Sequence, residues 1–388
     1  MKNQIIEQVE KIKERLWEIN DYIFYNPELG DEEFKAVEKL TSLLSEHAFK
    51  VKIGIANRET AFKAVYKSNL EGPTIAFLCE YDALPGIGHG CGHDMIGTIS
   101  VGAAIALSKV IGEVGGTIEV YGTPAEETCG AKIDMAEQGV FDNVDVAMMM
   151  HPYGKNCESG PSLAMEALKF DFTGKSSHAS SSPENGINAL DAVILMFNGI
   201  NALRQHVTSD VRIHGIISEG GKAANIVPDK AVAKFYIRAS KKNNLKEIIQ
   251  KVKNIANGAA MMTGATLEVS LYEPPFDDMN TNKNLSDSFN KNMRLLGITD
   301  INPSENIGSL DMGNVSYIVP SIHPLLGIGN PKLNLHTEEM AKATITKQAH
   351  DALITGVMAL ACTGYDVITE RELLSKIKKE FAKSLESV

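Results

Sequence analysis

Three short apolar runs that alternate with helix-like segments constrain the fold more than any other feature of this chain. The runs begin at residues 74, 116 and 144 and read TIAFLCEYDALP, GTIEVYGTPAEE and VDVAMMMHPYG. Strands that are apolar along their whole length, alternating with helices, are typical of a parallel sheet covered on both faces. We therefore predict an α/β domain with a mixed, largely parallel sheet. Its functional residues should lie just beyond the carboxyl ends of the strands.

A different pattern occupies about residues 169–273. It runs LKFDFTG, INALDAVILMFNGINALRQH, VRIHGIISEG, KAVAKFYIRAS, KNNLKEIIQKVKNIANGAAMMTG and ATLEVSLYE, which read as strand, helix, strand, strand, helix and strand. This β-α-β-β-α-β order is that of a ferredoxin-like domain. We predict that residues 168–279 form an inserted α+β domain, and that residues 1–167 and 280–388 together form the larger domain.

Both ends of the chain read as amphipathic helices. Apolar residues fall on one helical stripe near the N-terminus, at Ile5, Val9, Ile12, Leu16, Ile19 and Ile23. A second stripe, at Leu374, Ile377, Phe381 and Leu385, lies in the C-terminal tail. We expect the tail stripe to cover the chain's own core, with recruitment of a partner as the alternative.

Charge and cysteine usage narrow the class of protein. The net charge of −11 offers no basic face for nucleic acid. No apolar run approaches the length of a bilayer span, and the N-terminus lacks the apolar block of a signal peptide. Five scattered cysteines, an odd number, are typical of reduced thiols. We expect a cytoplasmic protein that binds neither nucleic acid nor a membrane.

Candidate ligands for a metal follow the first two predicted strands. Cys91 and His93 are two residues apart in GIGHGCGHDMIG, where alternate residues of an extended loop face one point. His89, in the same stretch, is a third ligand, a hydrogen-bond donor to a ligand, or a loop residue. Glu126 and Glu127 follow the second strand, and two adjacent carboxylates can divide cation binding and proton transfer between them.

Two further histidines complete the set. His151 closes the third predicted strand, and His336 lies in the loop NLHTEEM before the last long helix. A thiolate, several imidazoles and a carboxylate suit zinc or another late first-row metal. The set is too large for one structural zinc, which closes with four ligands, so it predicts two adjacent metal ions.

The segments EYDALPGIGHGCGHD, GTPAEE, MMHP, GKSSHASSSPENGINALDA and NIVPD together resemble the M20 family of dinuclear metallo-amidohydrolases. The resemblance extends from about residue 20 to about residue 365 and points to the aminoacylase-like and aminobenzoyl-glutamate-utilisation branch. The segment GSLDMGNVSYIVPSIHP resembles the M20-domain dipeptidases that act on β-alanyl and basic dipeptides. This resemblance implies a zinc-peptidase-like catalytic domain and an inserted domain that acts as lid and dimerisation module.

The resemblance also implies roles for individual residues. Glu126 matches the general base, and Asp82 matches an aspartate that orients a metal-binding side chain. His178, Asn225 and Arg238 match substrate-binding residues of the lid, and His178 also matches a group that stabilises charge on the scissile carbonyl. The residues that match metal ligands are Cys91, His93, Glu127, His151 and His336.

The reaction implied by the resemblance is hydrolysis of an amide bond in a small N-acyl amino acid or dipeptide. It uses a metal-activated water, with Glu126 as general base and two divalent ions per subunit. Zinc and manganese are the expected metals, with cobalt and nickel as alternatives. The family's lid histidine, here His178, often reaches the neighbouring subunit, which implies a homodimer.

Several points stay open at the level of sequence. The bridging ligand is Cys91 or Asp94, and His323 contacts the substrate or packs. A second function is a non-catalytic or partner-dependent subunit of a heteromeric amidohydrolase, although Glu126 beside a full ligand set argues for catalysis. A third is a thiol redox enzyme that uses Cys91 and Cys129, which requires the two sulfurs to lie close together.

Overall fold

The computed structural model of the chain describes residues 1–304 and 308–386 and divides into two compact units. Unit 1 comprises Met1–Pro161 and Met279–Val388, and unit 2 comprises Ser162–Asp278. Unit 2 is therefore an insertion between two parts of unit 1. The expected start of the insertion, residue 168, lies inside the first strand of unit 2.

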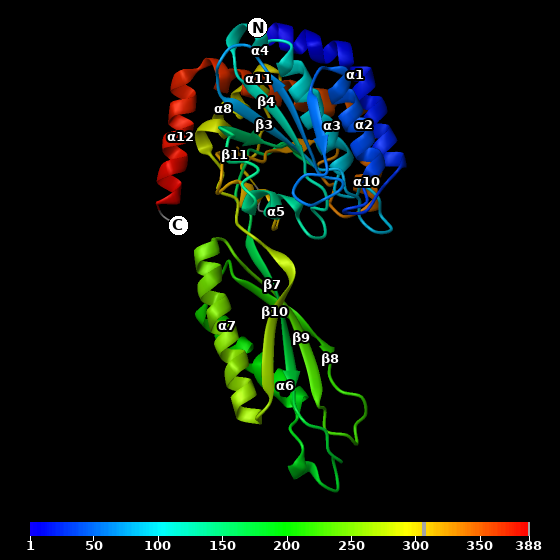
Figure 1. Ribbon diagram of the computed structural model, residues 1–388, viewed down its shortest axis with the longest axis vertical. Coiled ribbons are helices and arrows are strands. Elements are labelled where there is room, and N and C mark those ends of the chain that lie inside the picture. The colour runs from blue at the N-terminus through cyan, green and yellow to red at the C-terminus, as the bar shows by residue number, and fades with distance from the viewer. Residues whose placement is uncertain (305–307, 387–388) are drawn as a thin grey trace. The chain divides into compact units, whose positions relative to one another are not determined.

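Unit 1 is built on a six-stranded sheet in the order β1-β2-β4-β3-β5-β11. Figure 1 labels β3, β4 and β11 of this sheet. The pairs β4–β3, β3–β5 and β5–β11 are parallel, whereas β2 pairs antiparallel with β1 and with β4. The predicted mixed, largely parallel α/β sheet is confirmed. Its strands are β1 (Lys50–Ile53), β2 (Phe62–Lys67), β3 (Thr74–Cys79), β4 (Thr117–Gly122), β5 (Val146–Met148) and β11 (Ser321–Ile322).

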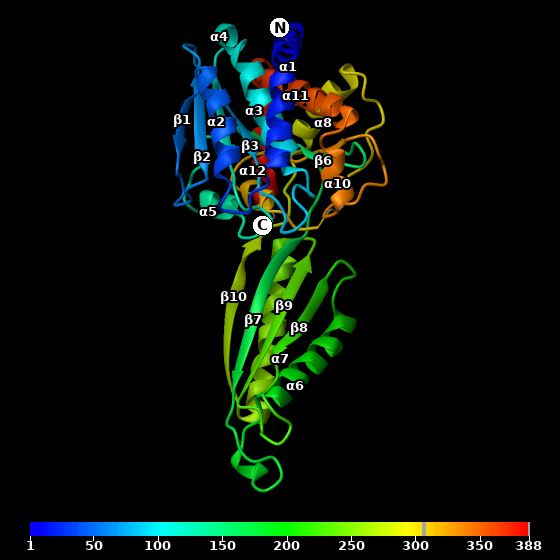
Figure 2. The ribbon, with the colours of Figure 1, turned by 90° about the vertical axis from the view of Figure 1, so that its right-hand side faces the viewer.

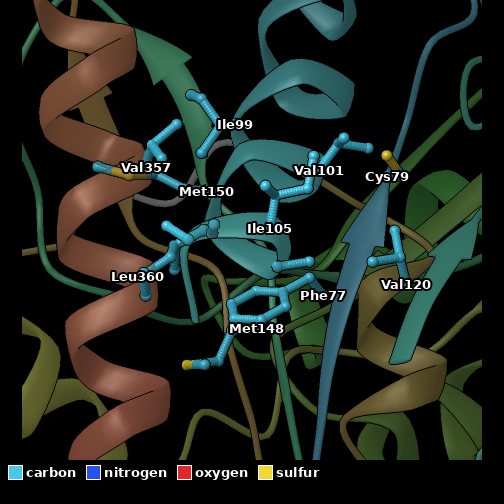
Figure 3. Close-up of a cluster of buried hydrophobic side chains, with 14 of the residues drawn as sticks. Phe77, Cys79, Ile99, Val101, Ile105, Val120, Met148, Met150, Val357 and Leu360 are labelled. Carbon is cyan, nitrogen blue, oxygen red and sulfur yellow. The ribbon is translucent and has the colours of Figure 1, made fainter. Parts of the chain in front are cut away.

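The central strand β3 shows how the sheet is buried on both faces. Ile75, Phe77 and Cys79 belong to one hydrophobic cluster, while the alternate residues Ala76 and Leu78 belong to another. Successive side chains of a strand point to opposite faces, so β3 contributes to a core on each side. Figure 3 shows the first cluster, in which strand residues meet apolar residues of α3 and α11.

The helices of unit 1 cover these two faces. All residues of α3 are buried, as expected for a central helix that is apolar all round. It packs against β3, α1 and α11. The helices are α1 (Lys2–Tyr25), α2 (Phe34–Glu46), α3 (His93–Ser108), α4 (Ile111–Val114), α5 (Ala131–Glu137), α8 (Lys283–Leu295), α9 (Met312–Val315), α10 (Glu338–Ala343), α11 (Lys347–Thr369) and α12 (Arg371–Leu385).

The two terminal stripes differ in their burial. On α1 the predicted stripe is buried except for Ile12, which is partly buried. On α12 only Ile377 is buried, and Leu385 is 38% exposed. The prediction that the tail stripe covers the chain's own core is therefore confirmed in part, since Ile377 belongs to the core cluster of unit 1 and Leu374 packs against it, whereas Leu385 is exposed.

Helix α11 is long and apolar enough, by length and composition alone, to cross a membrane. Its most apolar window is 78% buried inside the protein. Residues of α11 such as Leu353, Val357 and Leu360 pack in the same cluster as α3. The apolar surface of α11 is thus accounted for by the core of unit 1.

A second, two-stranded parallel sheet joins β6 (His151–Tyr153) to β12 (Leu325–Gly327). His151 therefore begins β6, and the prediction that it closes the third strand is wrong, because β5 ends at Met148. His93 also differs from expectation, since it is the first residue of α3 and not part of an extended loop.

Unit 2 is a four-stranded antiparallel sheet in the order β10-β7-β9-β8, with helices α6 and α7 packed on it (Figure 2). The predicted β-α-β-β-α-β order is confirmed. The buried side chains of the strands and both helices form one separate hydrophobic cluster. The elements are β7 (Ala164–Thr173), α6 (Ala189–Leu203), β8 (Arg212–Glu219), β9 (Lys230–Ala239), α7 (Lys242–Thr263) and β10 (Thr266–Phe276), with 3₁₀ turns at Pro183–Asn185 and Arg204–His206.

Candidate metal centre

Loops that follow β3, β4 and β5 bring the candidate residues of unit 1 together. These three strands are neighbours and parallel, so their carboxyl ends meet at one edge of the sheet. The β3 loop carries Asp82 and Cys91, and the β4 loop carries Glu126 and Glu127. The His336 loop joins them through its backbone, because the His336 N–H donates to the Gly90 carbonyl at 2.8 Å.

Three residues of these loops adopt left-handed backbone conformations. They are Gly92 (φ 81°), Ala125 (φ 59°) and His336 (φ 62°). For residues other than glycine this region is uncommon, and such residues concentrate at functional sites. Gly92 is required for a second reason, since a Cβ there would lie 2.4 Å from Pro152 Cγ.

Cys91 is common to two groups of potential ligands. The ligand atoms of Cys91, His93 and His151 lie within 4.8 Å of one another, and so do those of Cys91, Glu127 and His336. Cys91 Sγ is 3.4 Å from His151 Nε2. The thiol is therefore placed where it can contribute to two cations at once.

Hydrogen bonds orient two imidazoles toward this thiol. His93 Nδ1 donates to Asp82 Oδ1 at 2.8 Å, and its buried Nε2 has no hydrogen-bond partner among the described residues. His151 Nδ1 donates to the Pro152 carbonyl at 2.7 Å. Each ring is thus held through Nδ1 and presents Nε2 to the candidate centre, and this arrangement is the usual one for metal-binding histidines. Asp82 also accepts the Glu127 N–H at 3.0 Å.

The electrostatic surroundings of Cys91 and the two histidines favour bound cations. Burial raises the pKa of the Cys91 thiol well above its usual value, so a thiolate here requires a neighbouring positive charge. Burial lowers the pKa of His151 to about 4, which keeps that ring neutral and able to bind. Burial alone would lower the pKa of His93, but Asp82, Cys91 and Glu80 raise it well above its usual value.

His336 is the exposed member of the set. Its Nε2 lies 3.2 Å from Glu127 Oε1, and its side chain is 55% exposed. The hydrogen bond with Glu127, opposed by partial burial, raises the pKa of His336. Glu127 and His336 therefore lie at the mouth of the candidate centre, whereas Cys91 and His93 lie at its base.

Glu126 lies beside a buried group of charges that the sequence did not reveal. Its carboxylate, with those of Glu80 and Asp311, forms a further group whose oxygens lie within 4.8 Å of one another. Lys132 Nζ donates to Glu80 at 2.5 Å and to Asp311 at 2.7 Å. Burial, followed by the Glu80 and Asp311 charges, raises the pKa of Glu126 well above its usual value. Burial would lower the pKa of Lys132, but Asp311 and Glu80 raise it, so Lys132 stays charged.

Other candidates of this region lie outside the ligand groups. Asp94 is buried and accepts from Thr344 Oγ1 at 2.6 Å. His89 is buried, and burial lowers its pKa to about 4. His323 packs against the His151 ring with centroids 5.5 Å apart, and burial lowers its pKa to about 3. All three are thus structural neighbours of the ligand groups.

Cys129 has different surroundings from Cys91. Its Sγ donates to Asp31 Oδ2 at 3.1 Å and accepts from Arg58 Nη1 at 3.1 Å. All five cysteines are free thiols. These contacts give no support to a Cys91–Cys129 redox pair.

The three expected substrate-binding residues of the insertion belong to unit 2. The His178 Nδ1 atom accepts from the Ser180 and Ser181 N–H groups at 3.3 Å, and the Asn225 carbonyl accepts from Ala179 N at 3.0 Å. His178 and Asn225 therefore lie on adjoining segments. The Arg238 guanidinium lies 5.6 Å from the centroid of the Tyr236 ring, and its buried Nε has no partner among the described residues.

Arg238 lies at the opposite end of the unit 2 sheet from this pair. In the β7–β9 register Thr173 is opposite Lys230, and Met165 is opposite Arg238. His178 follows β7, so it lies beyond the Lys230 end of β9. Eight residues of strand separate that end from Arg238, which corresponds to about 26 Å.

Sequence comparison finds relatives over the whole chain. Residues 165–261 match the peptidase dimerisation domain. The chain is 35% identical over 400 residues to the Xaa-Arg dipeptidase of Mus musculus, covering 98% of this chain and 92% of that protein. It is 30% identical over 455 residues to one of the two subunits of the p-aminobenzoyl-glutamate hydrolase of Escherichia coli (strain K12), covering 97% of this chain and 94% of that protein.

Solved structures with the same fold include an aminobenzoyl-glutamate utilization protein from Klebsiella pneumoniae. Its TM-score is 0.74 at 20% identity, covering 95% of this chain and 99% of that one. A dinuclear metal-binding peptidase of the M20 family from Bacillus subtilis gives a TM-score of 0.66 at 20% identity, covering 90% and 98%. These likenesses establish the fold of both units.

Proposed function

This chain belongs to the M20 family, and on that premise we propose that it is a dinuclear metal-dependent amidohydrolase of small N-acyl amino acids or dipeptides. The observation that carries the proposal is the position of Cys91 in two ligand groups, with Glu126 next to both. The relatives support hydrolysis of an amide bond, since they include a dipeptidase and an aminobenzoyl-glutamate hydrolase.

The residues present fit a pair of divalent cations. The Nε2 atom of buried His93 has no hydrogen-bond partner among the described residues, and the buried Cys91 Sγ lies 3.4 Å from His151 Nε2, so these atoms are placed to share a cation. Zinc and manganese suit the mixture of sulfur, nitrogen and oxygen ligands, with cobalt and nickel as alternatives. When bound, such ions would polarise the substrate carbonyl and lower the pKa of a water molecule. The proposed ligands are Cys91, His93, Glu127, His151 and His336.

We propose that Cys91, and not Asp94, would contribute a ligand atom to both cations. Asp94 Oδ2 accepts from the Thr344 hydroxyl, Oδ1 is buried without a hydrogen-bond partner among the described residues, and the carboxylate belongs to none of the ligand groups found there. The Cys91 Sγ atom belongs to two of them. Asp82 orients His93 by accepting a hydrogen bond from its Nδ1–H.

Glu126 is the proposed general base. Its carboxylate lies within 4.8 Å of the ligand atoms of His93 and Glu127. A raised pKa suits a carboxylate that accepts a proton from water and returns it to the departing amine. Glu127, in contrast, is held by His336 and Asp82, so the two adjacent glutamates have different tasks.

We propose that substrate recognition requires a homodimer. Within one chain Arg238 and the His178–Asn225 pair are separated by about 26 Å of sheet, which is longer than a dipeptide. We therefore propose that Arg238 binds the substrate carboxylate of its own subunit. His178 and Asn225 would then serve the site of the partner. The match to a dimerisation domain supports this assembly.

The compartment we propose is the cytoplasm. The five thiols are all free, and Cys91 must stay reduced to bind cations. We propose a small molecule as the substrate and neither a nucleic acid nor a membrane as a partner. The acidic net charge of −11 supports the exclusion of nucleic acid.

Glu126→Gln tests the proposed function. Protein loaded with zinc, manganese or cobalt is assayed with dipeptides ending in arginine or lysine, N-acyl amino acids and aminobenzoyl-glutamate. We expect hydrolysis by the wild type and a loss of about 10²- to 10⁴-fold in kcat for Glu126→Gln, with unchanged metal content. The exposed Glu113→Gln is the matched control and should match the wild type. A Glu126→Gln variant with full activity would overturn the assignment.

A second candidate function is a component that is active only with a partner. It is favoured by the Escherichia coli relative, which is one of two different subunits of its hydrolase. In that case the metal-loaded protein alone hydrolyses none of these substrates and gains activity when a second, different subunit is added. Hydrolysis by the purified homodimer decides against it.

A further inference from the structure

A buried ion cluster beside the metal centre has no part in the proposed mechanism. It consists of Glu80, Lys132 and Asp311, whose residues are at most 2% exposed. Lys132 Nζ donates to Glu80 Oε1 at 2.5 Å and to Asp311 Oδ1 at 2.7 Å. The Lys132 backbone N–H also donates to Asp311 Oδ2 at 3.2 Å. We call these three residues the lysine cluster.

The lysine cluster ties together three segments that are distant in sequence. Glu80 directly follows β3, Lys132 is in the first turn of α5, and Asp311 precedes α9. Two of these segments adjoin loops of the candidate centre, since Asp82 follows Glu80 and Glu127 precedes α5. Removing one partner of an ion pair buried to this degree strongly destabilises the folded protein, because the remaining charge is left uncompensated.

Glu126 is the unpaired neighbour of this cluster. Its oxygens lie within 4.8 Å of those of Glu80 and Asp311. Of the three carboxylates, Lys132 binds two, while Glu126 makes no hydrogen bond or ion pair with residues 1–304 or 308–386. Three carboxylates in so small a volume attract a cation. Lys132 supplies that cation from the chain itself.

We propose that Lys132 is a tethered cation that holds Glu80 and Asp311 away from the metal ions and so keeps Glu126 free for proton transfer. Glu80 is already close to the ligands, since its Oε2 lies 3.4 Å from His93 Nε2. Without Nζ the Glu80 and Asp311 carboxylates lack a counter-ion and turn toward the cations bound there. Lys132 is thus a positioning residue, and this inference rests on the proposed function.

The test compares Lys132→Ala and Lys132→Met with the wild type. Both variants should fold and lose about 10²-fold or more in kcat, while KM stays within about threefold, because the substrate itself is bound by other residues. The control is Lys2→Ala. Lys2 also pairs with a buried carboxylate, Asp366, at 2.7 Å but lies away from the centre. The kcat of Lys2→Ala should therefore equal that of the wild type.

Chemical rescue distinguishes the loss of the Lys132 charge from the loss of its packing. n-Propylammonium replaces the part of the side chain that Lys132→Ala removes, and it should restore kcat by about tenfold or more in that variant alone. In metal-free protein it should raise the Tm of Lys132→Ala by about 2 °C or more, with no effect on the wild type or on Lys2→Ala. n-Propanol, an uncharged analogue, should have neither effect.

Two results would overturn the proposal. One is a wild-type kcat in Lys132→Met. The other is a Lys132→Ala variant in which n-propylammonium changes neither kcat nor Tm. If the wild type hydrolyses no substrate, the proposed function fails. The effect of n-propylammonium on the Tm of metal-free Lys132→Ala then decides alone whether Lys132 acts as a tethered cation.

Discussion

At the residue scale, the loop that carries both glutamates is held by one buried carboxylate. Glu33 accepts from the Ala125 N–H at 2.9 Å and from the Thr60 hydroxyl at 2.7 Å. Ala125 directly precedes Glu126 and has a left-handed backbone. Glu33 therefore fixes the conformation from which Glu126 and Glu127 extend. Nothing in the sequence around Glu33 indicates this contact, because Glu33 and Ala125 are 92 positions apart.

Glu33 leads to a prediction about the pH dependence of stability. Burial, with a smaller contribution from Asp82, raises the pKa of Glu33 from 4.5 to about 7. Between these values the folded chain keeps a proton that the unfolded chain releases. The contribution of Glu33 to the free energy of unfolding therefore falls as pH rises from about 4.5 to about 7 and is constant above that.

Glu33→Gln should remove this fall, since glutamine resembles the protonated acid. Urea unfolding of metal-free protein gives the free energy of unfolding. We expect this free energy to be about 2 kcal/mol higher for the variant than for the wild type at pH 8 and equal for the two near pH 4.5. The adjacent, exposed Glu32→Gln is the control and should follow the wild-type curve. Parallel curves for Glu33→Gln and wild type would contradict the assigned pKa.

Single residues of the candidate site could be predicted from sequence where their chemistry is unusual for their position. Cys91, His93 and the two glutamates stand beyond the ends of apolar strands, where charge or a thiol calls for an explanation. Lys132 and Asp311 could not be found in this way. They are 179 positions apart, and only the folded chain brings them into contact.

At the element scale, the start of α3 positions two of the proposed ligands. Cys91 precedes Gly92, and His93 is the first residue of the helix. A helix N-terminus orients the ring differently from an extended loop, so the spacing Cys-x-His predicted proximity but not the local structure. The left-handed Gly92 makes the turn possible.

Gly92→Ala should disturb this turn. The added Cβ would meet Pro152 Cγ at 2.4 Å, and alanine is strained at φ 81°. We expect a loss of about 1–3 kcal/mol in the free energy of unfolding and a loss of about tenfold or more in metal affinity. Gly112→Ala is the control, because a Cβ there meets nothing within 4 Å. Metal titration and urea unfolding of both variants provide the measurement, and equal values would contradict the role of Gly92.

The elements that sequence reasoning missed have weak patterns. The antiparallel pair β1–β2 was not expected, since β1 has only four residues and three of them are exposed. The start of β6 was also missed, because the apolar run 146–150 gives no sign of an interruption, whereas the structure ends β5 at Met148 and begins β6, in a second sheet, at His151. The apolar stripes located α1 and α12, although the α12 stripe is only partly buried.

At the scale of the whole molecule, the insertion separates residues that we propose bind the substrate. Arg238 and His178 lie at opposite ends of the unit 2 sheet. If His178 serves the partner, two inactive variants should complement each other. Glu126→Gln keeps an intact His178, and His178→Ala keeps an intact Glu126.

Mixed dimers of these two variants contain one site with both intact residues. After unfolding and joint refolding we expect up to about one quarter of wild-type activity, since about half of the dimers are mixed and each has one complete site. Each variant refolded alone should stay inactive. Two distinct affinity tags, one on each variant, verify that the dimers are mixed. If such dimers recover no activity, His178 belongs to the site of its own chain.

The proposed dinuclear centre requires Cys91 to contribute its thiolate to two cations. The most direct measurement is anomalous X-ray scattering at the zinc edge from crystals of the zinc-loaded protein. We predict two peaks per subunit, both at bonding distance from Cys91 Sγ, about 2.3 Å. His93 and His151 should adjoin one peak, and Glu127 and His336 the other. A single peak, or a pair bridged by Asp94 with Cys91 unbound, would contradict the account.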